Sequence, residues 1–111
     1  MTDLTITTRT APHGHVLTVR GALDVNTSPR LRQVYEDLTY TAGHELVLDL
    51  TDLEFCDSSG ISTFINARDH AASFGATFAL AAVPARTTKM IATIGLGEFF
   101  TRYDTVDQAN L

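Results

Sequence analysis

Residues 45–60, ELVLDLTDLEFCDSSG, decide the fold of this chain. Leu46, Val47 and Leu48 are apolar without alternation, which indicates a strand that is covered on both faces. The strand ends at Leu50, and residues 51–60 form a polar loop that leads into a helix, because Asp, Ser and Gly favour turns and helix starts. A buried strand that runs through a loop into a helix is the repeating unit of a parallel sheet.

Four further segments predict strands. Residues 5–10 and 15–21 alternate between apolar and polar side chains, and residues 12–14, PHG, form the turn of a hairpin between them. Residues 77–82 form a short apolar strand, and residues 99–103 form a last one.

Three helices connect these strands. The first begins at Pro29 with Thr27 or Ser28 as its N-cap, because a proline in the first turn loses no hydrogen bond. The second follows the loop and runs to about Phe74, and the third begins at Pro84. The faces expected to be buried recur at helical spacing and comprise Leu31, Val34, Tyr35 and Leu38; Ile61, Phe64, Ala67, Ala71 and Phe74; and Thr87, Met90, Ile91 and Ile94.

The order of elements, β-β-α-β-α-β-α-β, predicts an α/β fold with a mixed, mostly parallel sheet. The opening hairpin makes one edge antiparallel, and the helices pack against the sheet. We expect residues 1–111 to form a single domain, since the chain is too short for two cores. Functional groups in such sheets gather in loops at the carboxyl ends of the parallel strands, and residues 51–60 form one of these loops.

The composition excludes several classes of function. The chain is 44% apolar and 19% charged, as in ordinary globular domains. It has no membrane-length apolar run and no signal peptide, so we expect a cytoplasmic protein without a membrane partner. A net charge of −5 and a single lysine disfavour direct binding of nucleic acid. The single cysteine, Cys56, excludes an intrachain disulfide and a multi-cysteine metal site, and is expected to be a small buried apolar residue rather than a redox sensor.

The residues that look chemical are Asp57-Ser58-Ser59-Gly60, at the start of the second helix. A hydroxyl there can cap the helix, or it can carry a phosphate that the positive end of the helix tolerates. Gly60, without a side chain, allows another backbone or a ligand to approach closely. Taken alone, the tetrapeptide is more typical of an ordinary N-cap formed by Asp57 or Ser58.

Three segments together resemble the STAS-domain anti-sigma factor antagonist family. Residues 21–24, GALD, stand before the first helix as that family's G-x-[LI]-D segment does. Residues 48–50, LDL, lead to residues 55–61, FCDSSGI, which are similar to its strand and D-S-[ST]-G loop. Residues 94–96, IGL, are similar to its ending of the third helix. The resemblance departs at Ser62, where close members often carry glycine, and at Cys56, where a bulky apolar residue is usual.

The resemblance implies a regulatory switch rather than an enzyme, with no cofactor, metal or catalytic residue. Members of the family bind an anti-sigma factor, commonly a GHKL-type serine kinase, and thereby free a sigma factor. The kinase phosphorylates the serine after the loop aspartate, here Ser58, with Ser59 as the second choice, and a serine phosphatase reverses the step. The implied partner contacts are Asp24, Asn26, Thr27, Ser28, Asp57, Ser58, Ser59, Gly60 and Ser62. Formation of a weak homodimer is left open.

Two other functions remain as alternatives. A STAS module can serve another assembly without a sigma factor, such as a stress-signalling complex or a transport-associated protein. A small hydrolase is a distant third, because the G-x-S-x-G pattern is absent and no orienting third residue is assignable. Possible bases are His13, His15, His44 and His70, and their placement in the sequence singles out none of them. His13 and His15 supply two candidate metal ligands but no third, and an exposed histidine pair is the expected interpretation.

Overall fold

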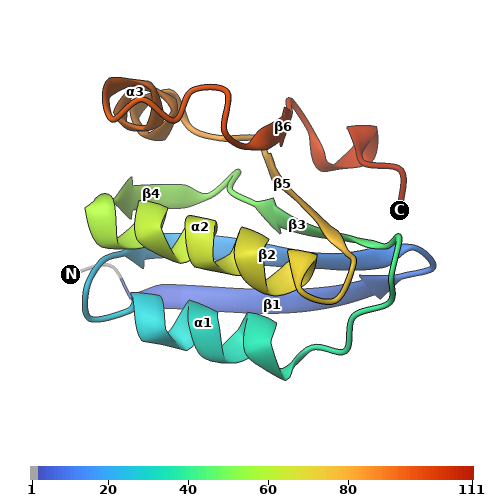
Figure 1. Ribbon diagram of the computed structural model, residues 1–111. Coiled ribbons are helices and arrows are strands. Elements are labelled where there is room, and N and C mark those ends of the chain that lie inside the picture. Colours follow the sequence, from blue (N-terminus) through green and yellow to red (C-terminus); the bar gives the residue numbers. More distant parts are fainter. Residues whose placement is uncertain (1–2) are drawn as a thin grey trace.

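The computed structural model describes residues 3–111, which form one mixed sheet with helices packed on it (Figure 1). The elements are β1 (Leu4–Ala11), β2 (Gly14–Leu23), α1 (Ser28–Asp37), β3 (Glu45–Asp49), β4 (Leu53–Cys56), α2 (Ser58–Ala72), β5 (Thr77–Ala81), α3 (Ala85–Thr93), β6 (Thr101–Tyr103) and the 3₁₀ helix η1 (Val106–Gln108). The strand order is β1-β2-β3-β5-β6, with β4 beside the end of β2. β1 and β2 are antiparallel and the other pairs are parallel, which confirms the predicted fold class.

The helices α1 and α2 lie side by side on one face of the sheet and bury the main core against it (Figure 1). Tyr35 of α1 and Phe64 of α2 are fully buried there, and the Tyr35 hydroxyl donates a hydrogen bond to Asn66 of α2. The C-terminal segment covers part of the opposite face, where Ala109 packs with Val16 and Val47. Within residues 3–111, no helix combines the length and apolar character that a membrane span requires.

The segment 51–60 is not a continuous loop, because it contains the strand β4. Leu53 pairs with Gly21 of β2, and Cys56 pairs with Leu23. The first half of β2 pairs with β3, which leaves the end of β2 free to accept a second parallel neighbour. The strand has only four residues and its middle is exposed, so the sequence carries no extended pattern that would indicate it.

Two residues predicted to be buried are exposed instead. Phe74 is 51% exposed because α2 ends at Ala72, and its ring stacks on Tyr40 rather than entering the core. Ile94 is 50% exposed, because α3 ends at Thr93 and Ile94 is its C-cap. Both residues lie beyond the end of their helix, where helical periodicity no longer describes the direction of the side chain.

Candidate functional site

The carboxyl ends of β2 and β4 lie side by side, and an aspartate follows each strand. Leu23 pairs with Cys56, and the Asp57 N–H donates to the Leu23 carbonyl over 3.2 Å. Asp24 and Asp57 therefore meet at one edge of the sheet, where α1 and α2 both begin (Figure 1). This pairing brings together the two segments that the sequence analysis assigned to one site.

Asp57 caps α2, and this leaves Ser58 without a structural task. The Oδ1 atom of Asp57 accepts hydrogen bonds from Ser59 N at 2.9 Å and from Gly60 N at 3.2 Å. Ser58 is the first residue of the helix and is exposed, and its hydroxyl makes no hydrogen bond to any other residue in the range 3–111. The ordinary capping role thus belongs to the carboxylate, and the neighbouring hydroxyl faces solvent at the positive end of a helix.

Asp24 organises the other segment in the same manner. Its Oδ1 accepts hydrogen bonds from Asn26 N at 2.9 Å and Thr27 N at 3.0 Å. Thr27 stands at the N-cap position of α1 but does not cap it, because its Oγ1 donates to the Ala22 carbonyl at 2.8 Å. The expectation of a side-chain cap from Thr27 is therefore wrong, and its hydroxyl holds the turn onto β2 instead.

Gly60 is buried and faces the protein core. A Cβ added at Gly60 would lie 2.5 Å from Cys56 Sγ, closer than real Cβ atoms approach other atoms, and 3.0 Å from Leu23 Cδ2, which is a tight contact. The glycine is buried in the first turn of α2 and lets that turn lie against β2 and β4. The close approach that we expected for Gly60 is made inside the domain, to Cys56 and Leu23.

A hollow of about 380 Å³ lies between the first turns of α1 and α2, and we call it the α1–α2 hollow. Hydroxyl side chains from both helices line it, namely Ser28, Ser59, Ser62 and Thr63. Its other lining residues are Val25, Pro29 and Arg32. The sequence analysis missed Val25, Arg32 and Thr63, although Val25, an apolar residue in a turn and 67% exposed, is the type of signal that marks a contact surface.

Comparison with known families decides the relationship. A family model described as "Mlab, STAS domain" matches residues 6–102 of the chain, which include the turn after β2, the helix α1, the strand β4 and the helix α2. The chain belongs to the STAS domain family. The predicted resemblance is thereby confirmed at the level of the domain.

Solved structures with the same fold include regulators and a transporter protein. An anti-sigma factor antagonist from Mycobacterium paratuberculosis is 25% identical, with a TM-score of 0.83 over 96% of this chain and 90% of that chain. The Bacillus cell fate determinant SpoIIAA, in its phosphorylated form, is 16% identical, with a TM-score of 0.69 over 94% of this chain and 95% of that chain. A sulfate transporter family protein from Wolinella succinogenes is 17% identical, with a TM-score of 0.76 over 89% of this chain and 83% of that chain.

Cys56 of this STAS domain is buried and its thiol is held protonated. Burial, and secondarily the nearby negative charge of Asp57, raises the pKa of the thiol to about 12. A thiol with such a pKa supplies little thiolate at neutral pH, and the thiolate is the reactive form. Cys56 is thus a packing residue against Gly60, which agrees with the expected small buried apolar role.

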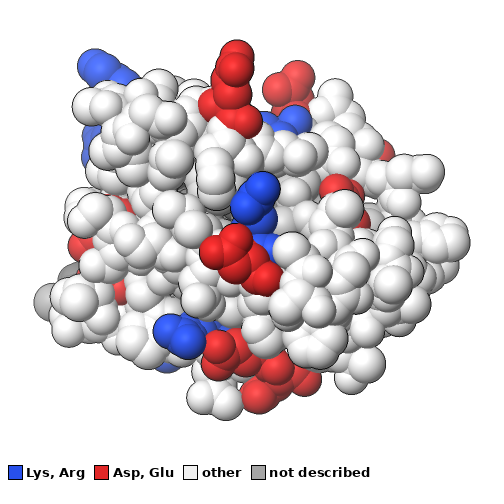
Figure 2. Space-filling model, in the orientation of Figure 1, with Lys and Arg blue, Asp and Glu red and all other residues white. Residues whose placement is uncertain are grey.

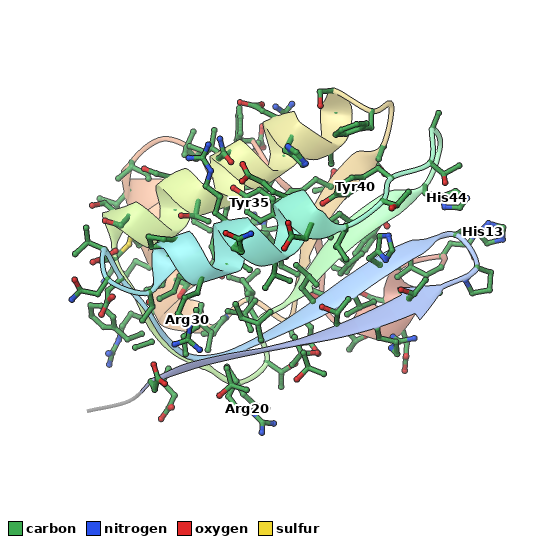
Figure 3. The ribbon with its side chains drawn as sticks, turned by 90° about the horizontal axis from the view of Figure 1, so that it is seen from below. His13, Arg20, Arg30, Tyr35, Tyr40 and His44 are labelled. Atoms are coloured by element: carbon green, nitrogen blue, oxygen red, sulfur yellow. The ribbon has the colours of Figure 1, made fainter. Side chains whose placement is uncertain are left out.

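The histidines lie far from Ser58. Figure 3 shows His13 and His44 together at the hairpin turn, with ring centroids 5.8 Å apart, whereas α2 begins at the opposite end of the sheet. The Nε2 atom of His15 donates a hydrogen bond to the Thr39 carbonyl at 2.8 Å, so its ring is directed toward Thr39 and does not pair with His13. His70 lies twelve residues along α2 from Ser58, which is about 18 Å at 1.5 Å per residue. Nothing in these positions gives Ser58 a general base.

Residues 3–111 contain no cluster of metal ligands, and the face shown in Figure 2 has no extended basic surface. No group of three or more His, Cys, Asp or Glu side chains within residues 3–111 is arranged to hold a metal ion. Acidic and basic side chains are interspersed over the face shown in Figure 2. Ion pairs among residues 3–111 include Arg20 with Asp52 and Arg32 with Glu36, each at 2.9 Å. A surface of this kind lacks the continuous cationic stripe that nucleic-acid binding requires.

Removal of the Asp57 cap is expected to destabilise the domain. Asp57→Ala leaves the N–H groups of Ser59 and Gly60 without their acceptor, at a cost of about 1 kcal/mol in the free energy of unfolding. Asp57→Asn keeps an oxygen acceptor at the same place and is expected to retain most of that stability. Urea denaturation of the three proteins measures the difference, and equal stability of all three would show that the cap contributes nothing.

Proposed function

We propose that this STAS domain is a cytoplasmic anti-sigma factor antagonist whose partner binding is switched off by phosphorylation of Ser58. In the unphosphorylated state it binds an anti-sigma factor, a serine kinase of the GHKL type, and so releases a sigma factor. The observation that carries this proposal is the exposed Ser58 hydroxyl at the positive end of α2, which does not cap the helix because Asp57 does. Family membership and the likeness to an anti-sigma factor antagonist support it.

Phosphoryl transfer to Ser58 requires little from the domain itself. The Ser58 oxygen forms a bond to the γ-phosphorus of ATP, the bond to ADP breaks, and the hydroxyl proton passes to a base on the kinase. The start of α2 then stabilises the new charge, because the helix dipole favours an anion there. The phosphoprotein therefore stays folded, and the effect is felt by the partner.

The partner meets a different surface after phosphorylation. The phosphate adds a charge of about −1.5 to −2 beside Asp57 and close in sequence to Glu54. A surface that accommodates a neutral hydroxyl then faces repulsion and the cost of desolvating a dianion. Release follows from this local change, and a separate serine phosphatase restores the binding form.

The proposed contact surface comprises the turn after β2 and the first turns of α2. Asn26, Ser58 and Ser62 are exposed, whereas Asp24, Asp57, Thr27 and Ser59 are partly buried. Ser28 and Gly60 are buried, so they shape this surface from beneath rather than forming its outer layer. Ser59 is the second-choice acceptor, because its side chain is less accessible and turns toward the α1–α2 hollow.

The decisive experiment uses purified components. The STAS domain is incubated with Mg-ATP and each GHKL-type anti-sigma kinase encoded in the same genome, and the modified residue is mapped by mass spectrometry. We expect one kinase to bind the domain, to modify Ser58 and to leave Ser58→Ala unmodified. Sigma factor release, followed by size-exclusion chromatography, should occur with Ser58→Ala and stop with the phosphoprotein. Absence of any binding kinase would overturn the proposal.

The second candidate is a STAS module in a transport-associated assembly. The likeness to a sulfate transporter family protein favours it, although at 17% identity that likeness concerns the fold alone. It predicts co-purification with a transport protein and no effect of Ser58→Asp on that contact. A modifiable hydroxyl at Ser58 has no role in this alternative, which is why the switch is preferred.

A further inference from the structure

The α1–α2 hollow has the chemistry of a site for a carboxylate. Four hydroxyl side chains line it, and the cation Arg32 is the only charged group among its lining residues. Hydroxyl and guanidinium groups donate hydrogen bonds to carboxylate oxygens, and no lining residue supplies a competing negative charge. The first turns of both helices converge on the hollow, so hydrogen-bond donors from both reach it.

Ser28, which lines the hollow, is a second and independent observation that points to a ligand. The residue is 7% exposed, and its Oγ has no hydrogen-bond partner among residues 3–111. A buried hydroxyl without a partner costs free energy, and native structures contain few of them. A polar group inserted from a binding partner would satisfy this donor.

Arg32 is available to such a partner. Its Nε is paired with Glu36 Oε2 at 2.9 Å, one helical turn away, and the side chains of Arg32 and Glu36 are 57% and 38% exposed. Exposed pairs of this spacing contribute only a few tenths of a kcal/mol, so the guanidinium can exchange Glu36 for a better placed carboxylate.

We infer that the α1–α2 hollow receives an Asp or Glu side chain of the anti-sigma partner, with Arg32 as its counter-ion. Val25, beside the hollow, adds apolar contact around the polar centre. The inference rests on the proposed function and specifies further that the partner's anchoring group is negatively charged.

The inference also explains how one phosphate can release the partner. Ser58 and Ser62 are four residues apart on α2 and therefore neighbours on its surface, and Ser62 lines the hollow. A phosphate on Ser58 thus lies at the margin of the hollow and repels an acidic anchor directly. A basic anchor would instead be attracted by the same phosphate, so a switch that releases on phosphorylation favours an acidic one.

The test measures affinity for the anti-sigma kinase identified by the phosphorylation experiment. Arg32→Ala is expected to weaken binding about 10-fold and Arg32→Glu about 100-fold, because the second change places like charges together. Glu36→Gln breaks the same intrahelical pair but keeps the cation, and should bind as tightly as the unaltered domain or more tightly. Arg9→Glu makes the same charge change on β1. Arg9 pairs with Val16, which is seven residues from the end of β2 at Leu23, or about 23 Å along the sheet at ~3.3 Å per residue. This variant should leave binding unchanged.

Charge reversal in the partner completes the test. Individual Asp→Lys and Glu→Lys changes on the kinase are screened against Arg32→Glu, and one of them should restore binding while weakening binding to the unaltered domain. If Arg32→Glu binds like the unaltered domain while Ser58→Asp does not, the acidic anchor is wrong and the phosphorylation switch stands. If no kinase binds the unaltered domain, both proposals fail.

Discussion

Replacement of Ser58 by aspartate is expected to weaken binding of the anti-sigma partner about 100-fold, which corresponds to ~3 kcal/mol. The new carboxylate lies beside Asp57 and opposes the surface that accepts a neutral hydroxyl. Ser58→Ala should bind as the unmodified domain does, since the hydroxyl makes no hydrogen bond within residues 3–111 that its loss would disturb. Isothermal titration calorimetry with the purified partner measures both affinities.

The loss of binding should not come from a loss of structure. An acidic residue in the first turn of a helix is mildly stabilising, by ~0.3–1 kcal/mol, so Ser58→Asp should melt no lower than the unaltered domain. Asn110→Asp adds the same charge at an exposed position in the C-terminal segment and serves as the matched control, with no expected change in affinity. Equal binding of Ser58→Asp and Ser58→Ala would refute the switch.

Gly60→Ala is expected to reduce the free energy of unfolding by about 1–3 kcal/mol, although alanine is the better helix former. The added methyl would lie 2.5 Å from Cys56 Sγ and 3.0 Å from Leu23 Cδ2, so α2 must move away from β2 and β4 or these side chains must rearrange. The helix-propensity gain of ~1 kcal/mol offsets only part of this cost.

Two companion variants make the result specific. Removal of the thiol by Cys56→Ala takes away the nearest clash, so Gly60→Ala should cost much less in that background, and a double-mutant cycle in urea quantifies the difference. At Gly97 an added Cβ meets nothing closer than 3.8 Å, so Gly97→Ala should change stability by less than about 0.5 kcal/mol. If Gly60→Ala is fully stable but loses partner binding, the glycine serves the interface and not the core.

The sheet was predictable because its signals are local. The apolar run at Leu46–Leu48, the alternation in residues 15–21 and the turn at residues 12–14 each indicate an element within a few neighbouring residues. β4 was missed because a strand of four residues, two of them exposed, has no pattern of its own. It exists because the end of β2 offers unpaired backbone groups, and that fact belongs to the sheet.

The residue types of the candidate site were predictable from the sequence, but the role of each residue in the structure was less so. Asp57 or Ser58 satisfied the composition of an N-cap equally well, and only the hydrogen bonds to Oδ1 assign the cap to Asp57. Val25 and Arg32 could not be assigned to the site, because the hollow that joins them to Ser59 and Ser62 forms only when α1 and α2 pack together.

The amino-acid sequence by itself determined the class of fold, the family and the position of the serine after Asp57, since periodicity and short motifs depend on residues close in the chain. The packing of α2 on β2 and β4 decided that Ser58 is exposed and Gly60 is buried. These two residues are two positions apart in one helical turn, and the direction in which each points depends on which face of α2 meets the sheet. That choice is made by contacts with residues more than thirty positions away, such as Leu23, and it exists only in the folded domain.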